Sequence, residues 1–286
     1  MSIDVVAPEL SEEEFTKFCE FFYRKTGILF ESKKKYFVER RLSERIVKSN
    51  NKDFREYFLA LRFEPGGEEM QSLVNAMTVN ETYFFREDYQ LKALIDGIMP
   101  EITGRKRRGE SVRVWSMPCS SGEEPYSLAI AMLEFWSDVD HYEVEILASD
   151  IDSSILTDAR AGIFSERSLQ RLPSHLLSKY FTRFSADKYK ISDDLRGSIS
   201  FSKANIIDPM QMAHYRGLDV IFCRNLLIYF DDVSRREAVE ALYDCLAPGG
   251  YVCLGHSESM SRISPLFQPR KFGEAIVYQK PIEPRR

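Results

Sequence analysis

Hydrophobic residues in the first 80 positions recur every three to four residues, which is the period of an amphipathic helix. Phe15, Phe18 and Phe22 form one such stripe. Ser11 is the expected N-cap of this helix and Gly27 its stop, because a serine oxygen accepts hydrogen bonds from free N–H groups and glycine tolerates the left-handed cap conformation. Three more helices are expected over residues 32–50, 53–63 and 70–79.

From about residue 110 the pattern changes to short hydrophobic runs separated by helical patterns. Strands that alternate with helices indicate a mainly parallel sheet covered on both faces. The expected fold class is therefore α/β, preceded by an all-helical N-terminal domain. The expected strands are 112–116, 144–150, 219–223, 250–256 and 275–280.

Residues 188–205 have a different pattern of hydrophobic and polar residues from the rest of the α/β region. β-Branched and aromatic residues alternate there with polar ones around a polar turn. This pattern predicts a small antiparallel β-subdomain, inserted at about 183–203. The expected organisation is a helical domain over 1–80, a linker that contributes to the site over 81–110, and the α/β domain over 111–286.

Composition narrows the possible functions. The chain has 286 residues and a formal net charge of −5, which argues against general affinity for nucleic acid. No hydrophobic run approaches the roughly 18 residues of a membrane span, and the acidic N-terminus lacks the basic start of a signal peptide. Five cysteines without a CxxC pair favour reduced thiols. We therefore expect a cytoplasmic protein that is not embedded in a membrane.

One segment is basic although the whole chain is acidic. Residues 24–48 hold nine Lys or Arg against three acidic residues, so the segment carries +6. Spacings of seven, four and three residues place four of these side chains on one helix face. A basic face suggests an acidic partner, although charge runs are more often simply solvated. The four residues are Lys34, Arg41, Arg45 and Lys48.

Asp150 ends the second expected strand. In doubly wound sheets ligands bind outside the carboxyl ends of the strands, and an acidic residue at this position can accept hydrogen bonds from both hydroxyls of a ribose. The alternative is a helix N-cap for the segment that follows, a role that Asp152 could also fill. The strand context favours the ribose role.

The turn after the first strand contains one glycine, Gly122, followed by Glu123 and Glu124. A dinucleotide site requires G-x-G-x-x-G, so that a pyrophosphate can approach the backbone. Two carboxylates would repel a phosphate but would suit a cationic nucleoside without phosphate. S-adenosylmethionine is such a molecule. Alternatively, the two glutamates only complement the positive end of a helix.

The segment 78–88 places polar residues among aromatic ones between the two domains. An aromatic run is most often core, but Asn80, Thr82 and Arg86 lie where two domains meet, which is a favoured place for clefts. The four histidines have no metal-ligand spacing, so no metal site is expected.

Taken together, five segments resemble the chemotaxis receptor glutamate methyltransferases, the CheR family. They are NAMTVNETYFFRE, SSGEEPYSLAI, ASDID, FCRNLLIYF and GGYVCLGHSES. Their order and spacing match the family from about residue 11 to residue 280. The resemblance implies a helical N-terminal domain and a Rossmann-like domain that binds S-adenosyl-L-methionine, with S-adenosyl-L-homocysteine as the product.

The resemblance also implies roles for individual residues. Arg86 would orient a carboxylate of the substrate or of the cofactor, and Tyr229 would shape the methyl-transfer pocket; both are expected catalytic residues. Asp150 would contact the ribose, and Asn205 with Ile206 the adenine end. The complete expected cofactor set is Asn80, Thr82, Arg86, Glu124, Asp150, Asn205, Ile206, Arg224 and Asn225.

The family's substrate is a glutamate side chain on the cytoplasmic helices of a chemoreceptor, and the product is its γ-methyl ester. A glutamate with a pKa near ~4.3 is already ionised at neutral pH and needs no general base. The basic face could dock on such acidic helices, although Glu44 lies between Arg41 and Arg45, where the family has a run of arginines.

The β-subdomain departs from part of the family. Some members grip a pentapeptide at the receptor's C-terminus through a longer loop that contains glycine. The segment 183–195 is shorter than such a loop and contains no glycine. We therefore expect this protein not to depend on a pentapeptide tether.

Two other functions compete with this interpretation. The segment RNLLIYF faintly resembles the Asn-Pro-Pro-Tyr signature of methyltransferases that act on amino groups, but the prolines are absent and the chain is acidic. The second alternative is a non-catalytic module that binds the cofactor and signals through a partner. Such a module would keep Asp150 and Glu124 and show no turnover.

Overall fold

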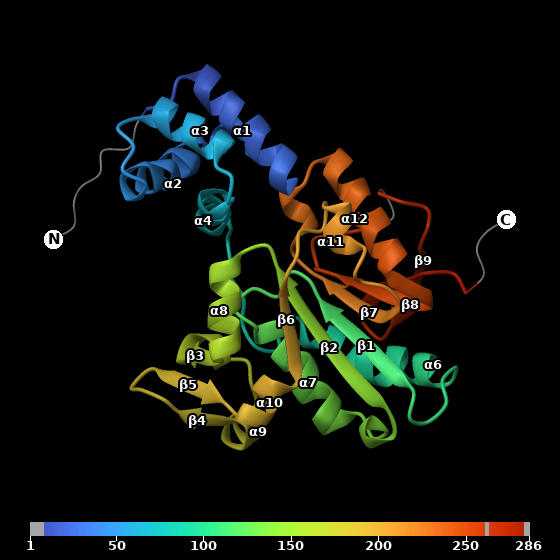
Figure 1. Ribbon diagram of the computed structural model, residues 1–286. Coiled ribbons are helices and arrows are strands. Elements are labelled where there is room, and N and C mark those ends of the chain that lie inside the picture. The colour runs from blue at the N-terminus through green and yellow to red at the C-terminus, as the bar shows by residue number, and fades with distance from the viewer. Residues whose placement is uncertain (1–8, 261–262, 283–286) are drawn as a thin grey trace. The chain divides into compact units, whose positions relative to one another are not determined.

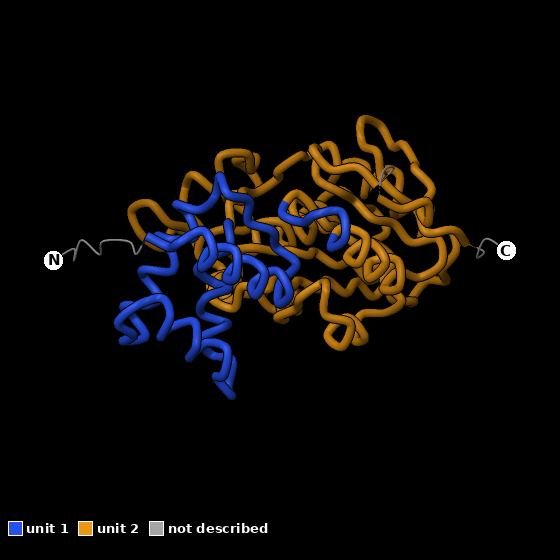
Figure 2. Tube along the Cα trace, turned by 90° about the horizontal axis from the view of Figure 1, so that it is seen from above, with its two compact units in different colours: residues 1–79, 229–234 blue, residues 80–228, 235–286 orange. Residues whose placement is uncertain are grey.

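The computed structural model describes residues 9–260 and 263–282. By the contacts within the chain it divides into two units. The first unit comprises residues 1–79 and 229–234, and the second comprises residues 80–228 and 235–286 (Figure 2). A short segment of the C-terminal half thus completes the N-terminal unit.

The first unit is helical. Its first helix, α1, begins with a capping box in which Glu14 N donates to Ser11 Oγ (3.2 Å) and Ser11 N donates to the Glu14 carboxylate (3.0 Å). Gly27 ends the helix with φ 73°. The cap and stop predicted from the sequence are therefore confirmed. The helices are α1 (Glu12–Thr26), η1 (Ser32–Lys34), α2 (Lys35–Lys48), α3 (Phe54–Phe63) and α4 (Glu68–Met77).

The predicted stripes form the core of this unit. Phe18 and Phe22 are fully buried and their rings lie 5.8 Å apart. The segment 229–234 joins this core through a β-bridge between Ile28 and Phe230. The Tyr23 hydroxyl also donates to the Asp231 carboxylate at 3.0 Å. These contacts explain why the segment belongs to the first unit although it is distant in sequence.

The second unit is built on a seven-stranded sheet of order β6-β2-β1-β7-β8-β10-β9 (Figure 1). Strands β6, β2, β1, β7 and β8 are parallel, and β10 and β9 are added antiparallel. All five predicted strands are confirmed. The strands are β1 (Ser111–Ser116), β2 (Glu143–Asp150), β6 (Ile199–Lys203), β7 (Leu218–Cys223), β8 (Leu246–Leu254), β9 (Gln268–Phe272) and β10 (Ala275–Gln279).

Helices connect and cover these strands. α7 packs against β1 and β2, and α8 packs against β2 and β6. The short π-helical turn η2 continues α5 and contacts α7. The elements are α5 (Asp88–Ala93), η2 (Leu94–Ile98), α6 (Met99–Thr103), α7 (Glu123–Phe135), η3 (Val139–His141), α8 (Ser153–Ala161), η4 (Glu166–Leu169), α9 (Ser174–Tyr180), α10 (Asp193–Gly197), α11 (Pro209–Met212), η5 (Leu227–Tyr229) and α12 (Asp232–Cys245).

A small antiparallel sheet of order β3-β5-β4 lies beside α9 and α10 (Figure 1). Its strands are β3 (Ile163–Ser165), β4 (Phe181–Arg183) and β5 (Lys188–Ile191). The prediction of a small antiparallel β-subdomain at about 183–203 is wrong in its second half, because β6 pairs in parallel with β2 in the large sheet. The helical turn α10 separates β5 from β6, and Ile199 is buried opposite Ile146.

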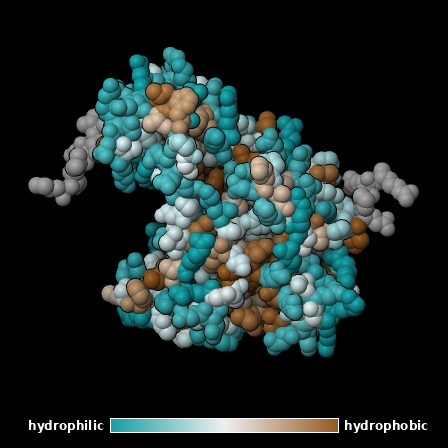
Figure 3. Space-filling view, in the orientation of Figure 1, coloured by the Kyte–Doolittle hydropathy of each residue, from teal (hydrophilic) through white to brown (hydrophobic). Residues whose placement is uncertain are grey.

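The surface in the view of Figure 3 is mostly hydrophilic, with hydrophobic residues in several separate areas. The most exposed large hydrophobic side chains belong to Met210, Tyr36 and Phe63, with exposed fractions of 83%, 75% and 72%. Within the described ranges, none of the helices combines the length and the hydrophobicity needed to cross a membrane.

Candidate functional site

The loop between β1 and α7 needs a glycine at position 122. Gly122 has φ 99°, and a Cβ atom there would lie 3.0 Å from the Tyr126 ring and 3.2 Å from Cβ of Ala159. Only glycine combines this backbone conformation with so close an approach. The loop therefore turns directly into α7 at the carboxyl end of β1.

Asp150, at the end of β2, is the centre of this edge of the sheet. Its carboxylate is almost completely buried and accepts hydrogen bonds from Ser120 N (2.9 Å) and Asp152 N (3.0 Å). Burial raises the pKa of Asp150 to about 6, although these backbone hydrogen bonds oppose the shift. The loop after β1 is thus fixed to the end of β2 through one carboxylate.

Asp152 takes the capping role that the sequence also allowed for Asp150. Its Oδ1 accepts from Ser154 N (2.9 Å) and Ile155 N (3.0 Å) at the start of α8. Its Oδ2 accepts from the Asn80 side-chain amide at 2.9 Å. Asp150 is therefore not the N-cap, and Asn80, which directly precedes the linker, is held at the same edge.

The two glutamates of the loop are not presented to solvent as negative charges. The Glu123 carboxylate accepts from the hydroxyls of Ser121 and Ser168, both at 2.6 Å. Glu124 accepts from Ser116 Oγ (2.8 Å) and pairs with the Arg224 guanidinium (2.8 Å). Burial raises the pKa of both glutamates. The argument that two free carboxylates repel a phosphate therefore needs correction.

Arg224 connects three segments that are distant in sequence. Besides Glu124 it contacts the Glu87 carboxylate at 3.2 Å and the main-chain oxygen of Arg86 at 2.8 Å. Burial opposes the charge of this guanidinium, but the two carboxylates hold its pKa above the usual value. The linker residues 86 and 87 are thereby fastened to the ends of β1 and β7.

Asn225 follows in the left-handed conformation with φ 59°. Its N–H donates to Oε2 of Glu258 at 2.7 Å, and Gly255 N donates to the same oxygen at 2.8 Å. Asn225 is therefore held by a residue that follows β8. An αL conformation is unusual outside glycine, although asparagine is one of the residues that adopt it most readily.

Unsatisfied polar atoms gather at this edge. In the described part of the chain, four buried side-chain polar atoms have no hydrogen-bond partner. Three of them are Gln90 Oε1, Arg224 Nε and Glu258 Oε1, around the ends of β7 and β8. Buried polar groups without partners are rare and point to a missing ligand or water. A ligand with both donors and acceptors fits this edge, and the amino-acid part of S-adenosylmethionine has both.

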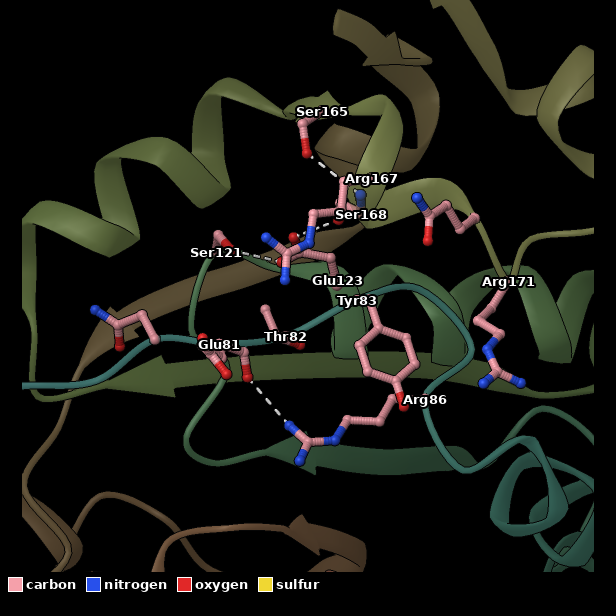
Figure 4. A pocket seen from close by; sticks show the side chains of 12 residues that line it. Glu81, Thr82, Tyr83, Arg86, Ser121, Glu123, Ser165, Arg167, Ser168 and Arg171 are labelled. Atoms are coloured by element: carbon pink, nitrogen blue, oxygen red, sulfur yellow. Dashed lines mark hydrogen bonds between the residues drawn. The ribbon is translucent and has the colours of Figure 1, made fainter. Parts of the chain in front are cut away.

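A polar pocket of about 580 Å³ opens beside the linker (Figure 4). Its residues come from the linker, from the start of α7 and from η4 with the turn after it. They include three of the predicted site residues. The lining consists of Asn80, Glu81, Thr82, Tyr83, Arg86, Ser121, Glu123, Ser165, Arg167, Ser168, Gln170 and Arg171.

The structure gathers most of the predicted cofactor residues at one edge of the second unit. Asn205 and Ile206 follow β6, whose last residue pairs with Asp150, and Ala204 N donates to Asp150 O at 3.0 Å. Tyr229 belongs instead to the first unit, where its main-chain oxygen accepts from Leu29 N at 3.1 Å. The catalytic role of Tyr229 stays a prediction.

The basic face formed by Lys34 at the end of η1 and by Arg41, Arg45 and Lys48 of α2 is only partly available to a partner. The Arg45 guanidinium is largely buried and pairs with Glu69, at 2.9 Å and 2.5 Å. Arg41 lies 3.8 Å from Glu44, and Lys34 and Lys48 are exposed. Arg45 therefore serves the packing of the helical unit, and a docking surface is left with Lys34, Arg41 and Lys48.

Several residues of the site were not predicted from the sequence. Glu87, Ser116 and Glu258 fix Arg224, Glu124 and Asn225. Each lies within a segment named in the sequence analysis, but none was given a role. The SES motif after the strand β8 was the available signal for Glu258. Arg167 and Arg171 gave no signal, because the fold alone brings them beside the linker. Within the described ranges, His, Cys, Asp and Glu form no group arranged to hold a metal ion.

The chain is similar to known families and proteins over nearly its whole length. Residues 80–276 match "CheR methyltransferase, SAM binding domain" and residues 13–78 match "CheR methyltransferase, all-alpha domain". The chain is 50% identical to "Chemotaxis protein methyltransferase 2" of Vibrio cholerae, over 95% of this chain and 94% of the relative. It is 34% identical to "Chemotaxis protein methyltransferase" of Borreliella burgdorferi, over 88% and 89%. It is 36% identical to "Chemotaxis protein methyltransferase 2" of Pseudomonas aeruginosa, over 93% and 92%.

These matches confirm the resemblance, the fold class and the cofactor expected from the sequence. The second unit is a Rossmann-like methyltransferase domain for S-adenosylmethionine, and the all-helical domain precedes it. Both domains and their order are those of a single family. This chain belongs to the CheR methyltransferase family.

Proposed function

We propose that this protein methylates specific glutamate side chains on the cytoplasmic helices of chemoreceptors and forms γ-methyl esters. The observation that carries the proposal is the 50% identity, over nearly the whole chain, to a chemotaxis protein methyltransferase. Such receptors present their methylation sites in the cytoplasm, so we propose that the protein acts there. S-adenosyl-L-homocysteine is the second product.

The edge around Asp150 would hold the cofactor. Asp150 would accept hydrogen bonds from the ribose hydroxyls, and Asn205 with Ile206 would contact the adenine end. Arg224 and Asn225 would line the methyl-transfer end, near which the unsatisfied polar atoms gather. When bound, S-adenosylmethionine supplies a methyl group on a positively charged sulfur. The remaining residues proposed to contact it are Asn80, Thr82, Arg86 and Glu124.

The proposed methyl transfer depends on the correct placement of the glutamate carboxylate and the methyl group more than on proton transfer. A glutamate carboxylate is ionised at neutral pH, and placement of reacting groups can contribute roughly 7–11 kcal/mol to lowering a barrier. Burial raises the pKa of Cys119 and Cys223 well above the usual value, so these thiols stay protonated and are poor nucleophiles. We propose that Arg86 orients a carboxylate and that Tyr229 shapes the methyl-transfer pocket.

Affinity for S-adenosylmethionine should fall as the pH falls below about 6. Asp150 has a pKa of about 6, and only its ionised form can accept hydrogen bonds from both ribose hydroxyls without competition from its own proton. Calorimetric titration should show a constant dissociation constant above pH 7 and a rise of about tenfold per pH unit below 6. The variant D150N should bind weakly at every pH. Equal wild-type affinity at pH 7.5 and pH 5 would contradict this role for Asp150.

The raised pKa of Asp150 makes the stability of the cofactor-free protein depend on pH in the opposite direction, so that this stability increases as the pH falls. The folded state binds the Asp150 proton more tightly than the unfolded state, whose aspartates titrate near the ordinary value of 3.8. The contribution of Asp150 to the free energy of unfolding is therefore largest below about pH 4 and is lost as the pH rises through 6. Saturating cofactor should remove most of this dependence.

The remaining basic face, Lys34 of η1 with Arg41 and Lys48 of α2, is proposed to dock on the acidic receptor helices. The double variant K34Q/K48Q should raise the KM for a receptor cytoplasmic fragment several-fold at low salt, with kcat unchanged. Salt should reduce the difference, because exposed charges are screened. The matched control is K52Q, which removes an exposed charge of the same unit outside this basic face. Equal KM values for wild type and K34Q/K48Q would remove the docking proposal.

The small sheet is proposed not to bind a C-terminal pentapeptide. Its β4–β5 connection is a tight turn in which Phe184 N and Ser185 N both donate to Lys188 O, at 2.9 Å and 3.1 Å. The connection contains no long loop and no glycine. Titration with an aromatic–Glu-type pentapeptide should give no heat that corresponds to a dissociation constant below about 1 mM. Micromolar binding would overturn this proposal.

One assay separates the proposed function from its rivals. The protein is incubated with methyl-labelled S-adenosylmethionine and a receptor cytoplasmic fragment, and the product is treated with alkali. Labelled methanol released by alkali indicates an ester on a carboxylate. A label that resists alkali indicates methylation of an amino group, and no label on the fragment indicates a module without turnover. Only the first outcome agrees with the proposal.

A further inference from the structure

Two arginines of the pocket have no assigned role. Arg167 of η4 and Arg171 just after it are exposed, and both line the cavity of about 580 Å³. In the view of Figure 4, the Arg167 side chain lies above the Tyr83 ring of the linker and the Arg171 side chain lies to the right of that ring. Within residues 9–260 and 263–282, neither guanidinium has a hydrogen bond or an ion pair. Other arginines of this unit, such as Arg113 and Arg224, do pair with carboxylates.

The charges that face the cavity leave it positive. Arg86, Arg167 and Arg171 contribute cations, whereas Glu81 and Glu123 are its acidic residues. Glu123 is buried and both of its oxygens accept from serine hydroxyls. Its charge is therefore largely compensated within the protein. Glu81 is exposed and contributes only its main-chain oxygen to Arg86, at 3.1 Å.

The neutral groups of the lining also suit an anion. Hydroxyls and amides from Thr82, Ser165 and Gln170 line the cavity together with the arginines. Arginine is preferred where a carboxylate is recognised, since its planar guanidinium can donate two parallel hydrogen bonds. A cavity of about 580 Å³ has room for a side chain that carries a carboxylate.

We propose that this cavity, the arginine pocket, binds an acidic side chain of the substrate protein next to the glutamate that is methylated. Residues three or four positions apart on a helix have Cβ atoms only about 5–6 Å apart, so two acidic residues of one helix face can reach neighbouring sites. The inference rests on the proposed function and adds a determinant of substrate choice. Phosphate-bearing ligands share this chemistry in part, and the test below separates them.

The test compares R167Q/R171Q with wild type. The KM for a receptor cytoplasmic fragment should rise about tenfold, with kcat within about twofold. Neither arginine belongs to the residues proposed to hold the cofactor or to act at the methyl group, so their contact acts equally in ground and transition states. The dissociation constant for S-adenosylmethionine, measured by calorimetry, should not change. The matched control is R108Q, which removes an exposed arginine of the same unit outside the pocket. Its KM should equal that of wild type.

A second arm changes the substrate. In a fragment whose acidic residues flanking the methylated glutamate are replaced by Gln, wild type should lose about the same factor in KM. R167Q/R171Q should lose little more, because one contact cannot be removed twice. Additive losses would overturn the proposal, as would an unchanged KM in the first arm or a weakened affinity for S-adenosylmethionine. Inhibition of wild type, but not of R167Q/R171Q, by millimolar inorganic phosphate and not by glutamate peptides would assign the pocket to phosphate instead.

Failure of this inference differs from failure of the proposed function. If wild type transfers no alkali-labile methyl group to any receptor fragment, the proposed function fails before the pocket is tested. If wild type transfers it and R167Q/R171Q is equally effective, only the arginine pocket is wrong.

Discussion

Asp150→Ala should weaken the binding of S-adenosylmethionine at least a hundredfold and reduce kcat/KM by a similar factor. The substitution removes the carboxylate proposed to hold both ribose hydroxyls, and a hydrogen bond to a charged group contributes about 1.5–3 kcal/mol. It also leaves Ser120 N and Asp152 N without their acceptor, so the loop after β1 loses its attachment to β2. Calorimetric titration at pH 7.5 measures the effect.

The control for this prediction is Asp140→Ala, which removes an exposed acidic residue of the same unit. Its affinity should equal that of wild type. If Asp150→Ala keeps wild-type affinity while its far-ultraviolet circular dichroism is unchanged, the cofactor does not depend on the end of β2.

Arg224→Met should lower the free energy of unfolding by about 3–5 kcal/mol, because it leaves buried carboxylates without their cation. Arg224 is nearly inaccessible and pairs with both Glu87 and Glu124. For a unit of this size the loss corresponds to a decrease in Tm of roughly 10 °C. Thermal unfolding followed by circular dichroism measures the decrease.

The physical cause of that loss can be checked with a double variant. Arg224→Met combined with Glu124→Gln removes one of the two uncompensated charges and should recover part of the stability. The defect of Arg224→Met alone should also be smaller at pH 5 than at pH 8, because burial raises the pKa of Glu124 and the stranded carboxylate can then take up a proton. A double variant less stable than the single one would show that packing, and not charge, accounts for the loss.

Local patterns predicted most of the fold. The Ser11 cap, the Gly27 stop and the phenylalanine stripe of α1 are properties of neighbouring residues, and so are the five hydrophobic runs that became strands. The placement of β6 was not predictable in this way. Alternation over 199–203 indicates a strand but does not show which strand it pairs with. The burial of Ile199 against β2 depends on tertiary contacts that the local sequence does not contain.

The location of the site was predicted better than the charge state and partners of its side chains. Asp150 follows from the rule that ligands bind at the carboxyl ends of parallel strands, and the structure gives it the expected place. The glutamates of the loop suggested a cationic cofactor because their carboxylates were expected to be free. In the structure Glu123 is buried and accepts hydrogen bonds from two serine hydroxyls, and Glu124 pairs with an arginine 100 residues away in the sequence. No local pattern contains such a long-range pair.

The arginine pocket illustrates the same limit. Arg167 and Arg171 lie in a segment without a motif, and only the fold brings them beside Tyr83 and Arg86. Sequence patterns therefore locate residues that act with their own neighbours in the chain, such as caps, turns and strand ends. Residues that act across the fold are found from the structure.

A crystal structure of this protein with S-adenosyl-L-homocysteine tests the central claim most directly. The account predicts ribose hydroxyls within hydrogen-bond distance of the Asp150 carboxylate, the adenine beside Asn205 and Ile206, and the sulfur on the side of Arg224 and Asn225. A ligand bound elsewhere, with Asp150 still held only by Ser120 and Asp152, would contradict it.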